Sequence, residues 1–389
     1  MQRSNERILT THVGSLPRPP GLLEAMKTKL SGRPHDPALY DERVKAAVEA
    51  SVRKQAAAGL DVLTDGEMSK PGFFVYVKER LEGFEPRPGQ GPVPFAAERE
   101  AFPEYYADYF KRAMTGGGVA PIVPMFCVGP VRYRGQAALA KDLANLKAAL
   151  ANAPHVEAFI PAVAPSGVGH NEYYKTEEDY LLAVGEALRE EYLAIVEAGF
   201  IVQIDDPFLC DIFVEPGLSD AAKRTKAQAY VEAVNHSLRG IPQERVRFHT
   251  CYGINEGPRI HEASLYEVVN YMLRVNAGAY SFEAANARHE HEYHLWESVK
   301  LPDGKLIIPG VITHASNIVE HPELIAERIQ RFANLVGREN VIAAADCGFS
   351  SQAMLQTEVH PAVMWAKFES LVEGARLASS KLWPQRKHQ

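Results

Sequence analysis

The sequence predicts a TIM (β/α)8 barrel, an α/β fold in which eight parallel strands alternate with helices. Apolar runs alternate with helical segments along most of the 389-residue chain. The runs are apolar throughout, as parallel strands are when both faces of their sheet are covered. In a barrel the ends of these runs meet at one mouth, whereas in a doubly wound open sheet, the competing fold, they form a line. Polar side chains gather at these ends, namely Ser15, Glu67, Asp205, His249, Cys251, Glu283, His314 and Cys347.

Four strands and three helices are predicted in the first half of the chain. Helix 41–58 is typical of the pattern, because Val44, Ala47 and Val48 recur at three- and four-residue steps and Gly59 follows where a helix ends. The predicted strands are 8–15, 60–67, 156–165 and 200–207, and the predicted helices are 41–58, 142–152 and 177–198.

The same alternation continues in the second half. Gly278 and Gly337 follow two of the helical segments, and an apolar run begins soon after each glycine. The predicted strands are 246–252, 279–283, 306–312 and 341–347, and the predicted helices are 220–238, 265–276, 322–336 and 365–379. We expect residues 1–389 to form a single barrel domain.

Residues 73–135 interrupt the alternation. Aromatic, proline and charged residues crowd 73–118, which predicts an insertion or a long loop with short helices. The apolar run 121–133 contains Pro121, Pro124 and Pro130, and these prolines favour an edge hairpin over a central strand.

Composition excludes several classes of function. The net charge is −7 and no cluster of Lys or Arg indicates a nucleic-acid surface. No apolar run reaches the roughly 18–20 residues of a membrane span, and residues 1–7 lead into no signal-peptide core. The four cysteines are too few for a disulfide framework in a chain of this length, so we expect reduced thiols and a cytoplasmic location.

His249 and Cys251 suggest a metal site. Residues i and i+2 of a strand point to the same side, so a neutral imidazole lies beside a thiol. Taken alone, the pair also fits a buried strand that carries both residues by chance. Glu283 and Cys347 add two further ligand types at the ends of other runs. Two thiolates favour Zn²⁺ over Mg²⁺ or Ca²⁺, which prefer oxygen ligands.

The predicted ligands belong to three separate strands, which favours a catalytic ion over a structural one, whose ligands are usually closely spaced in a loop. His249, Cys251 and Cys347 would be the firm ligands, and Glu283 the exchangeable one. An incoming substrate thiol would take the place of Glu283 and react as a thiolate. Because one anion replaces another, the net charge of the ligand set would not change.

Seven motifs stand out over nearly the whole chain. They are residues 10–18 (TTHVGSLPR), 64–67 (TDGE), 203–207 (QIDDP), 249–252 (HTCY), 282–283 (FE), 309–314 (PGVITH) and 346–349 (DCGF). With these motifs in the family's order, the chain resembles the cobalamin-independent methionine synthase family, specifically its C-terminal catalytic barrel.

The resemblance implies an enzyme that transfers a methyl group to homocysteine to give methionine. It implies a zinc ion bound by His249, Cys251, Glu283 and Cys347. It also implies that Ser15 receives the carboxylate of the amino acid, that Glu67 and Asp205 hold its ammonium, and that His314 helps to protonate the departing methyl carrier. Simpler roles remain open: a helix start for Glu67, a turn for Asp205 and a hydrogen-bond donor for His314. The partners implied are a small-molecule thiol and a methyl donor, either a folate or a corrinoid or corrinoid protein.

Three features depart from the family's pattern. We expect no counterpart of the additional N-terminal half by which the long members help to bind folate, and Asp206 stands where Glu is more usual. The segment 286–294 also differs, and its histidines His289, His291 and His294 suggest either a second metal site or, as we expect, a solvated lid.

Three other functions compete with methyl transfer to homocysteine. The first is alkyl transfer to another thiol, as in the related epoxyalkane:coenzyme M transferase, where Arg18 near Ser15 would receive a sulfonate. The second is a zinc-binding protein without turnover. The third is a decarboxylase related to uroporphyrinogen decarboxylase, a family that lacks this ligand set. The sequence leaves the oligomeric state open.

Overall fold

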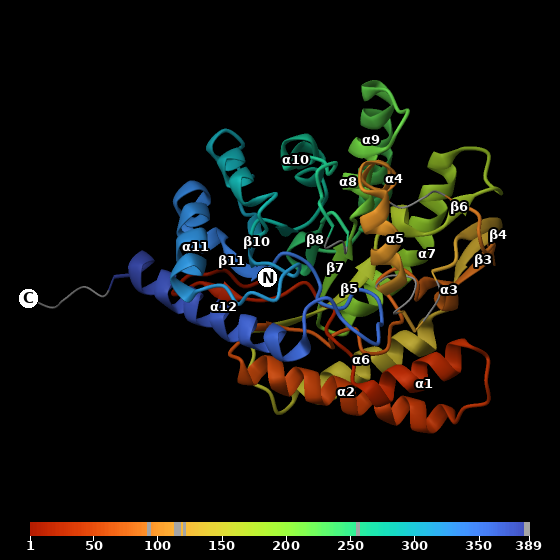
Figure 1. Cartoon of the computed structure of the whole chain (residues 1–389), viewed down its shortest axis with the longest axis horizontal. Coiled ribbons are helices and arrows are strands. Elements are labelled where there is room, and N and C mark those ends of the chain that lie inside the picture. The colour runs from red at the N-terminus through yellow and green to blue at the C-terminus, as the bar shows by residue number, and fades with distance from the viewer. Residues whose placement is uncertain (92–94, 113–117, 120–121, 254–256, 385–389) are drawn as a thin grey trace, which may run out of the picture.

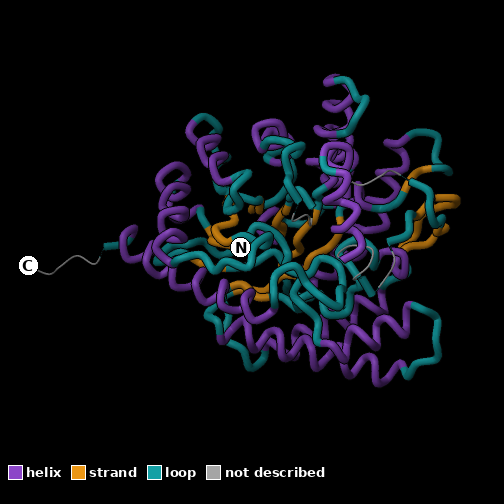
Figure 2. The backbone as a smooth tube through the Cα atoms, in the orientation of Figure 1, coloured by secondary structure: helices purple, strands orange, loops and turns teal. Residues whose placement is uncertain are grey.

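The structure is a computed structural model that describes residues 1–384 except 92–94, 113–117, 120–121 and 254–256. Pro121 and the corresponding parts of the predicted insertion therefore lie outside the described residues. Helices surround a central group of strands, and a smaller sheet lies to one side (Figure 1). The same arrangement is visible by element type in Figure 2.

Eight parallel strands form the central sheet, in the order β1-β11-β10-β9-β8-β7-β5-β2. Asp61 N donates to Thr10 O at 3.1 Å and Thr11 Oγ1 to Val62 O at 3.1 Å, so the first and last strands nearly close the ring. The TIM barrel prediction is confirmed. The strands are β1 (Leu9–Thr10), β2 (Val62–Leu63), β5 (Glu157–Val163), β7 (Ile201–Asp205), β8 (Val246–His249), β9 (Ala279–Phe282), β10 (Leu306–Ile312) and β11 (Ile342–Ala345).

The predicted helices are all present, most of them within a few residues of the expected bounds. Side-chain caps begin several of them: Thr176 accepts from Asp179 N, and Ser264 forms a capping box with Glu267. They are α2 (Pro37–Ala57), α6 (Gln136–Leu150), α7 (Glu177–Glu197), α9 (Asp220–Ser237), α10 (Leu265–Met272), α11 (Pro322–Val336) and α12 (Pro361–Leu382).

Among the described residues, the α-helices α1 (Pro20–Leu30) and α8 (Phe208–Val214) were not predicted. Each follows a proline-containing segment that the sequence indicates as a turn. Pro20 is nevertheless compatible with α1, because a proline in the first turn lacks only an N–H that has no partner within the helix. Within the described residues, no helix combines the length and the apolar character needed to cross a membrane.

The predicted insertion forms a small sheet and short helices beside the barrel (Figure 1). Strand β3 (Leu81–Pro86) pairs antiparallel with β4 (Met125–Tyr133), as expected for a hairpin, and β4 also pairs with β6 (His170–Asn171). The helices are α3 (Val77–Arg80), α4 (Ala96–Ala101) and α5 (Pro103–Arg112). Arg80 joins this region to the barrel helices, because its guanidinium pairs with Asp142 of α6 and with Glu191 of α7 at 3.0 Å.

Gly310 gives a test of how closely the strands pack at the mouth. It pairs with Ala344 at an irregularity between β10 and β11, and an added Cβ would overlap Asp346 Oδ1. We expect Gly310→Ala to lower the free energy of unfolding by about 1–3 kcal/mol, as overpacking does. Gly21→Ala in α1 is the control, since its Cβ would meet nothing within 4 Å. Urea unfolding measures both, and equal stability of the two variants would contradict the close packing.

Candidate metal centre and substrate pocket

The barrel register brings the candidate residues to one edge. Asp205, His249 and Ser281 are direct neighbours across the parallel strands β7, β8 and β9. Each strand ends at or just after this row, so the loops that follow share one mouth. Cys251, Glu283, His314 and Cys347 all lie one or two residues beyond the ends of their strands.

Three of the predicted metal ligands form one buried group. The ligand atoms of His249, Cys251 and Cys347 all lie within 4.8 Å of one another. The two sulfur atoms are 3.4 Å apart, beyond the roughly 2.05 Å of a disulfide and near the roughly 3.8 Å that two sulfurs span on a tetrahedral ion with Zn–S bonds of about 2.3 Å. Strand β8 ends at His249, earlier than predicted, yet Cys251 still reaches the group.

The chemistry of this group suits a soft divalent cation. His249 Nδ1 is 3.1 Å from Ser281 Oγ, and the buried Nε2 has no hydrogen-bond partner among the described residues. Burial lowers the pKa of His249 to about 3, which keeps the imidazole neutral as a metal ligand must be. The hydrogen bond with Cys347 and burial raise the pKa of Cys251, and a bound cation would lower it again. These donors therefore fit Zn²⁺.

Glu283 lies beside this group with its carboxylate bound elsewhere. Tyr252 N donates to Oε1 at 3.1 Å, and Arg259 Nη2 and Asn286 Nδ2 donate to Oε2 at 2.7 and 2.8 Å. Burial alone would raise the pKa of Glu283, but Arg259 and His314 lower it to about 2. The side chain is thus a buried carboxylate anion next to three possible ligands, held in place by N–H donors.

Asp346 was missed as a functional residue by the sequence analysis. Its Oδ1 accepts from Ala284 N and Ala285 N, both at 2.7 Å, and its Oδ2 from Asn286 Nδ2 at 3.1 Å. It thereby joins the loop after β9, which carries Glu283, to the end of β11. Burial raises the pKa of Asp346 to about 6. The signals in the sequence are its position directly before the candidate ligand Cys347 and its place in the motif 346–349 (DCGF).

Ser15 lies at the other side of the same mouth. Its Oγ is 3.3 Å from Ser351 Oγ, and a Cβ at Gly348, next to Cys347, would overlap it. Leu16 N donates to Gly66 O at 3.1 Å, which joins this turn to the segment that carries the next candidate residue. Two hydroxyls and nearby backbone form a small polar surface beside the candidate metal ligands.

Glu67 and Asp205 are two buried carboxylates that influence one another. Burial raises the pKa of both, and the charge of Glu67 raises that of Asp205 further. Glu67 adopts a left-handed backbone conformation, φ 56°, and its Oε2 has no partner among the described residues. Gln203 Nε2 donates to Asp205 Oδ1 at 2.7 Å. Buried Lys70, which donates to Pro161 O, opposes the pKa rise at both carboxylates.

His314 is buried and has no hydrogen-bond partner at either ring nitrogen in the part of the chain that the structure describes. Its ligand atom lies within 4.8 Å of those of Glu283 and Asp346. Burial lowers its pKa to about 4, so the ring is neutral near pH 7. Both carboxylates already accept from several N–H donors, so His314 is the one group of the three with free bonding capacity.

Arg18 and His289 are both buried and have structural partners. Arg18 is buried and donates to Ser350 O at 2.7 Å and Glu67 O at 2.9 Å. His291 and His294 are exposed, as a solvated lid requires, but that expectation is wrong for His289, which is buried. The lid prediction failed there because two carboxylates hold the ring: burial alone would lower the pKa of His289, and these carboxylates raise it to about 9.

Comparison with known proteins agrees with this geometry. A family model described as the catalytic domain of cobalamin-independent synthase matches residues 8–111 and 167–367. The methionine synthase of Sulfurisphaera tokodaii is 25% identical over 379 residues, covering 96% of this chain and 93% of the relative. The methionine synthase of Saccharolobus islandicus is 24% identical over 379 residues, covering 96% of this chain and 95% of the relative.

A solved structure shares the fold. The B12-independent methionine synthase from Shewanella sp. W3-18-1, in complex with selenomethionine, has a TM-score of 0.72 and 20% sequence identity, and the match covers 97% of this chain and 99% of that one. The internal gap in the family match, 112–166, includes β4 of the side sheet, α6 and the barrel strand β5. Since the family model matches well over half of the chain, the protein belongs to the family of cobalamin-independent synthase catalytic domains.

Proposed function

We propose that this protein is a zinc-dependent methyltransferase that transfers a methyl group to the thiol of homocysteine and so forms methionine. The observation that carries the proposal is the buried group of His249, Cys251 and Cys347, whose ligand atoms converge within 4.8 Å at the barrel mouth. Family membership supports it, and so do relatives that are named methionine synthases.

His249, Cys251 and Cys347, whose ligand atoms converge, would hold the ion. Glu283, whose carboxylate here groups with His314 and Asp346, would be the exchangeable fourth ligand. A bound Zn²⁺ would lower the pKa of the substrate thiol, so that it attacks the methyl carbon as a thiolate. The chain's own contribution is orientation: Ser281 fixes the ring of His249 through Nδ1, which leaves Nε2 directed at the group. Burial of all four side chains excludes water from the reacting sulfur.

The amino-acid part of homocysteine would bind beside this centre. In the proposal Ser15 receives the carboxylate, and Glu67 and Asp205 receive the ammonium. A cation between two buried carboxylates forms charge-assisted hydrogen bonds and relieves their mutual repulsion. This arrangement favours an amino-acid thiol over coenzyme M, because the sulfonate of coenzyme M would need a free cation and Arg18 already binds two backbone carbonyls.

The methyl donor is a folate or a corrinoid in this proposal. His314 would help to protonate the departing methyl carrier by relaying a proton through its neutral ring, whose two nitrogens have no other partner among the described residues. A zinc-binding protein without turnover is the alternative function, and it would bind the ion and the thiol but transfer no methyl group.

Removal of one thiolate tests the metal centre. We expect Cys347→Ala to weaken zinc binding about 100-fold or more, since loss of an outer-shell partner alone costs about 10- to 100-fold. Cys127→Ala is the matched control, because Cys127 is also a buried free thiol but donates to Gly129 O and belongs to neither metal-ligand group of the described residues. Competition with a chromophoric chelator measures both. Equal zinc affinity in the two variants, or no zinc binding by the wild type, would remove the proposed centre.

The pH dependence of methionine binding tests the ammonium site. Methionine has no thiol, so its affinity reports the amino-acid contacts without thiol ionisation. Because the pKa values of Glu67 and Asp205 are raised, a proton occupies the pair as pH falls, and it must leave when the ammonium binds. We expect affinity to fall between pH 8 and pH 5.5, by up to about tenfold per pH unit.

A ligand without the amino group provides the control for this measurement. Calorimetric titration with 4-(methylthio)butanoate should show little pH dependence over the same range, because no ammonium competes with the proton at Glu67 and Asp205. In Asp205→Asn the profile for methionine should flatten. Identical profiles for the two ligands with the wild type would show that the carboxylates do not hold the ammonium.

Kinetics of a His314 variant test the proton-transfer role. We expect His314→Gln to lower kcat about 10²- to 10⁴-fold, the usual range for a general acid, with little change in the KM for homocysteine. A raised KM with unchanged kcat would assign His314 to substrate binding.

The donor is identified with the wild type, by assaying methyltetrahydrofolate and methylcobalamin each with homocysteine and with coenzyme M. No turnover with any of these pairs would favour the non-catalytic alternative.

A further inference from the structure

Arg259 belongs to none of the motifs of the family resemblance, yet it makes a direct bond to a candidate metal ligand. Its side chain is buried, and Nη2 lies 2.7 Å from Glu283 Oε2 while Nε lies 2.6 Å from Glu262 Oε1. Nη1 is buried without a hydrogen-bond partner among the described residues. The backbone of Arg259 is left-handed, φ 58°, an uncommon conformation for a residue with a side chain.

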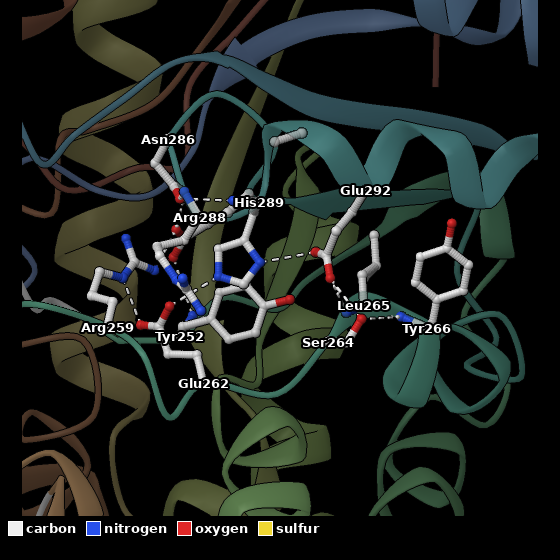
Figure 3. Close-up of polar contacts among 12 residues, drawn as sticks. Tyr252, Arg259, Glu262, Ser264, Leu265, Tyr266, Asn286, Arg288, His289 and Glu292 are labelled. Atoms are coloured by element: carbon white, nitrogen blue, oxygen red, sulfur yellow. Dashed lines mark hydrogen bonds and ion pairs between the residues drawn. The ribbon is translucent and has the colours of Figure 1, made fainter.

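A continuous chain of buried polar groups holds Arg259 in place (Figure 3). Glu262 Oε2 lies 2.9 Å from His289 Nε2, and His289 Nδ1 lies 2.9 Å from Glu292 Oε2. Glu292 Oε1 then accepts from Ser264 Oγ at 2.7 Å and from Leu265 N at 2.9 Å, at the start of α10. The chain thus runs from the metal centre to a helix N-terminus, where a carboxylate is stabilised.

The charges along this chain alternate, so each buried ion lies between partners of opposite sign. Tyr252 adds rigidity, because its ring stacks on that of His289 with centroids 3.9 Å apart and an angle of 7° (Figure 3). His261 N donates to Glu98 Oε1 of α4 at 2.7 Å, which fixes the loop from the side of the insertion. Arg259 is therefore a fixed cation and not a mobile surface group.

Glu283 has three donors in its present position: the guanidinium of Arg259, the amide of Tyr252 and the side chain of Asn286. Tyr252 directly follows the candidate ligand Cys251, so this position is immediately beside the centre. A carboxylate that left a metal ion without such donors would be a buried unpaired charge, which is strongly unfavourable.

We propose that Arg259 is a positioning residue that, with Tyr252 N and Asn286 Nδ2, forms a second binding place for the Glu283 carboxylate. The carboxylate occupies this place when the substrate thiol replaces it as a metal ligand. The inference rests on the proposed function and adds to it the destination of the displaced carboxylate. One anion replaces another, the proton of the thiol goes to solvent, and the charge at the centre does not change.

The test compares Arg259→Met and Arg259→Lys with Arg328→Met. Arg328 is a suitable control because it is also buried and also binds a carbonyl and a carboxylate, Val311 O at 3.0 Å and Glu290 Oε2 at 2.8 Å. Three quantities are measured on the full chain: zinc affinity without thiol by chelator competition, homocysteine affinity of the zinc-loaded protein by calorimetry, and the zinc coordination shell by X-ray absorption with and without homocysteine.

In Arg259→Met we expect the zinc affinity without thiol to be unchanged. Homocysteine binding should weaken about tenfold or more, which is the loss expected for a charge-assisted hydrogen bond. The zinc should also retain an oxygen ligand after homocysteine is added. Arg259→Lys should lie between this variant and the wild type, because an ammonium cannot bind Glu262 and Glu283 in the fixed geometry of a guanidinium. Arg328→Met should match the wild type in all three measurements. If Arg259→Met does not fold, the Lys variant carries the comparison.

Two results would overturn the inference. Unchanged homocysteine affinity in both Arg259 variants would show that the carboxylate needs no second place. A parallel loss of zinc affinity and homocysteine affinity would show that Arg259 only supports the fold of the centre. If instead the wild type binds no zinc, or its coordination shell does not change with homocysteine, the proposed function fails together with this inference.

Discussion

The mouth of the barrel depends on one buried carboxylate. Asp346 accepts hydrogen bonds from Ala284 N, Ala285 N and Asn286 Nδ2, so the loop after β9 is fastened to the end of β11. The absence of a side chain at Gly310 makes room for Asp346 Oδ1. Without these bonds nothing in the local strand pairing would hold the two loops together, because β9 and β11 are not adjacent in the sheet. Asp346 thereby holds Glu283 of the first loop close to the end of β11, next to Cys347 in the sequence.

Charge balance divides the mouth into two regions of different character. Around Glu283 the carboxylate finds a cation and two further N–H donors, so it is an anion with its partners already present. Around Glu67 and Asp205 burial raises the pKa of both carboxyl groups and outweighs the cations Lys70, Arg18 and Arg247, which act to lower it. The first region is complete in itself, whereas the second gains stability when a positively charged group enters. This difference is the physical basis for assigning the amino-acid end of the substrate to the second region.

The sequence predicts the barrel well because its signals are local. The spacing of apolar residues, and the glycines and prolines that end the elements, locate strands such as 306–312 and helices such as 322–336. The observed bounds of both are the predicted ones. Candidate residues at strand ends follow from the same periods, and His249, Cys251 and Cys347 do meet. The actual position of Glu283 could not be predicted, because it depends on Arg259, whose loop carries no repeating pattern. Burial of His289 was missed for the same reason, since its partners lie 27 and 3 residues away.

The 3.4 Å separation of Cys251 and Cys347 also has a consequence for the protein outside its reaction. Two thiols this close need only lose two electrons and two protons to join as a cystine, and coordination to a cation would protect both sulfurs from oxidants. Metal loss and oxidation of the two thiols should therefore accompany one another. A molecule that loses its ion to a chelator in air would form the disulfide and could then no longer bind the ion. Handling under reductant would then preserve the capacity of the centre and not merely the solubility of the preparation.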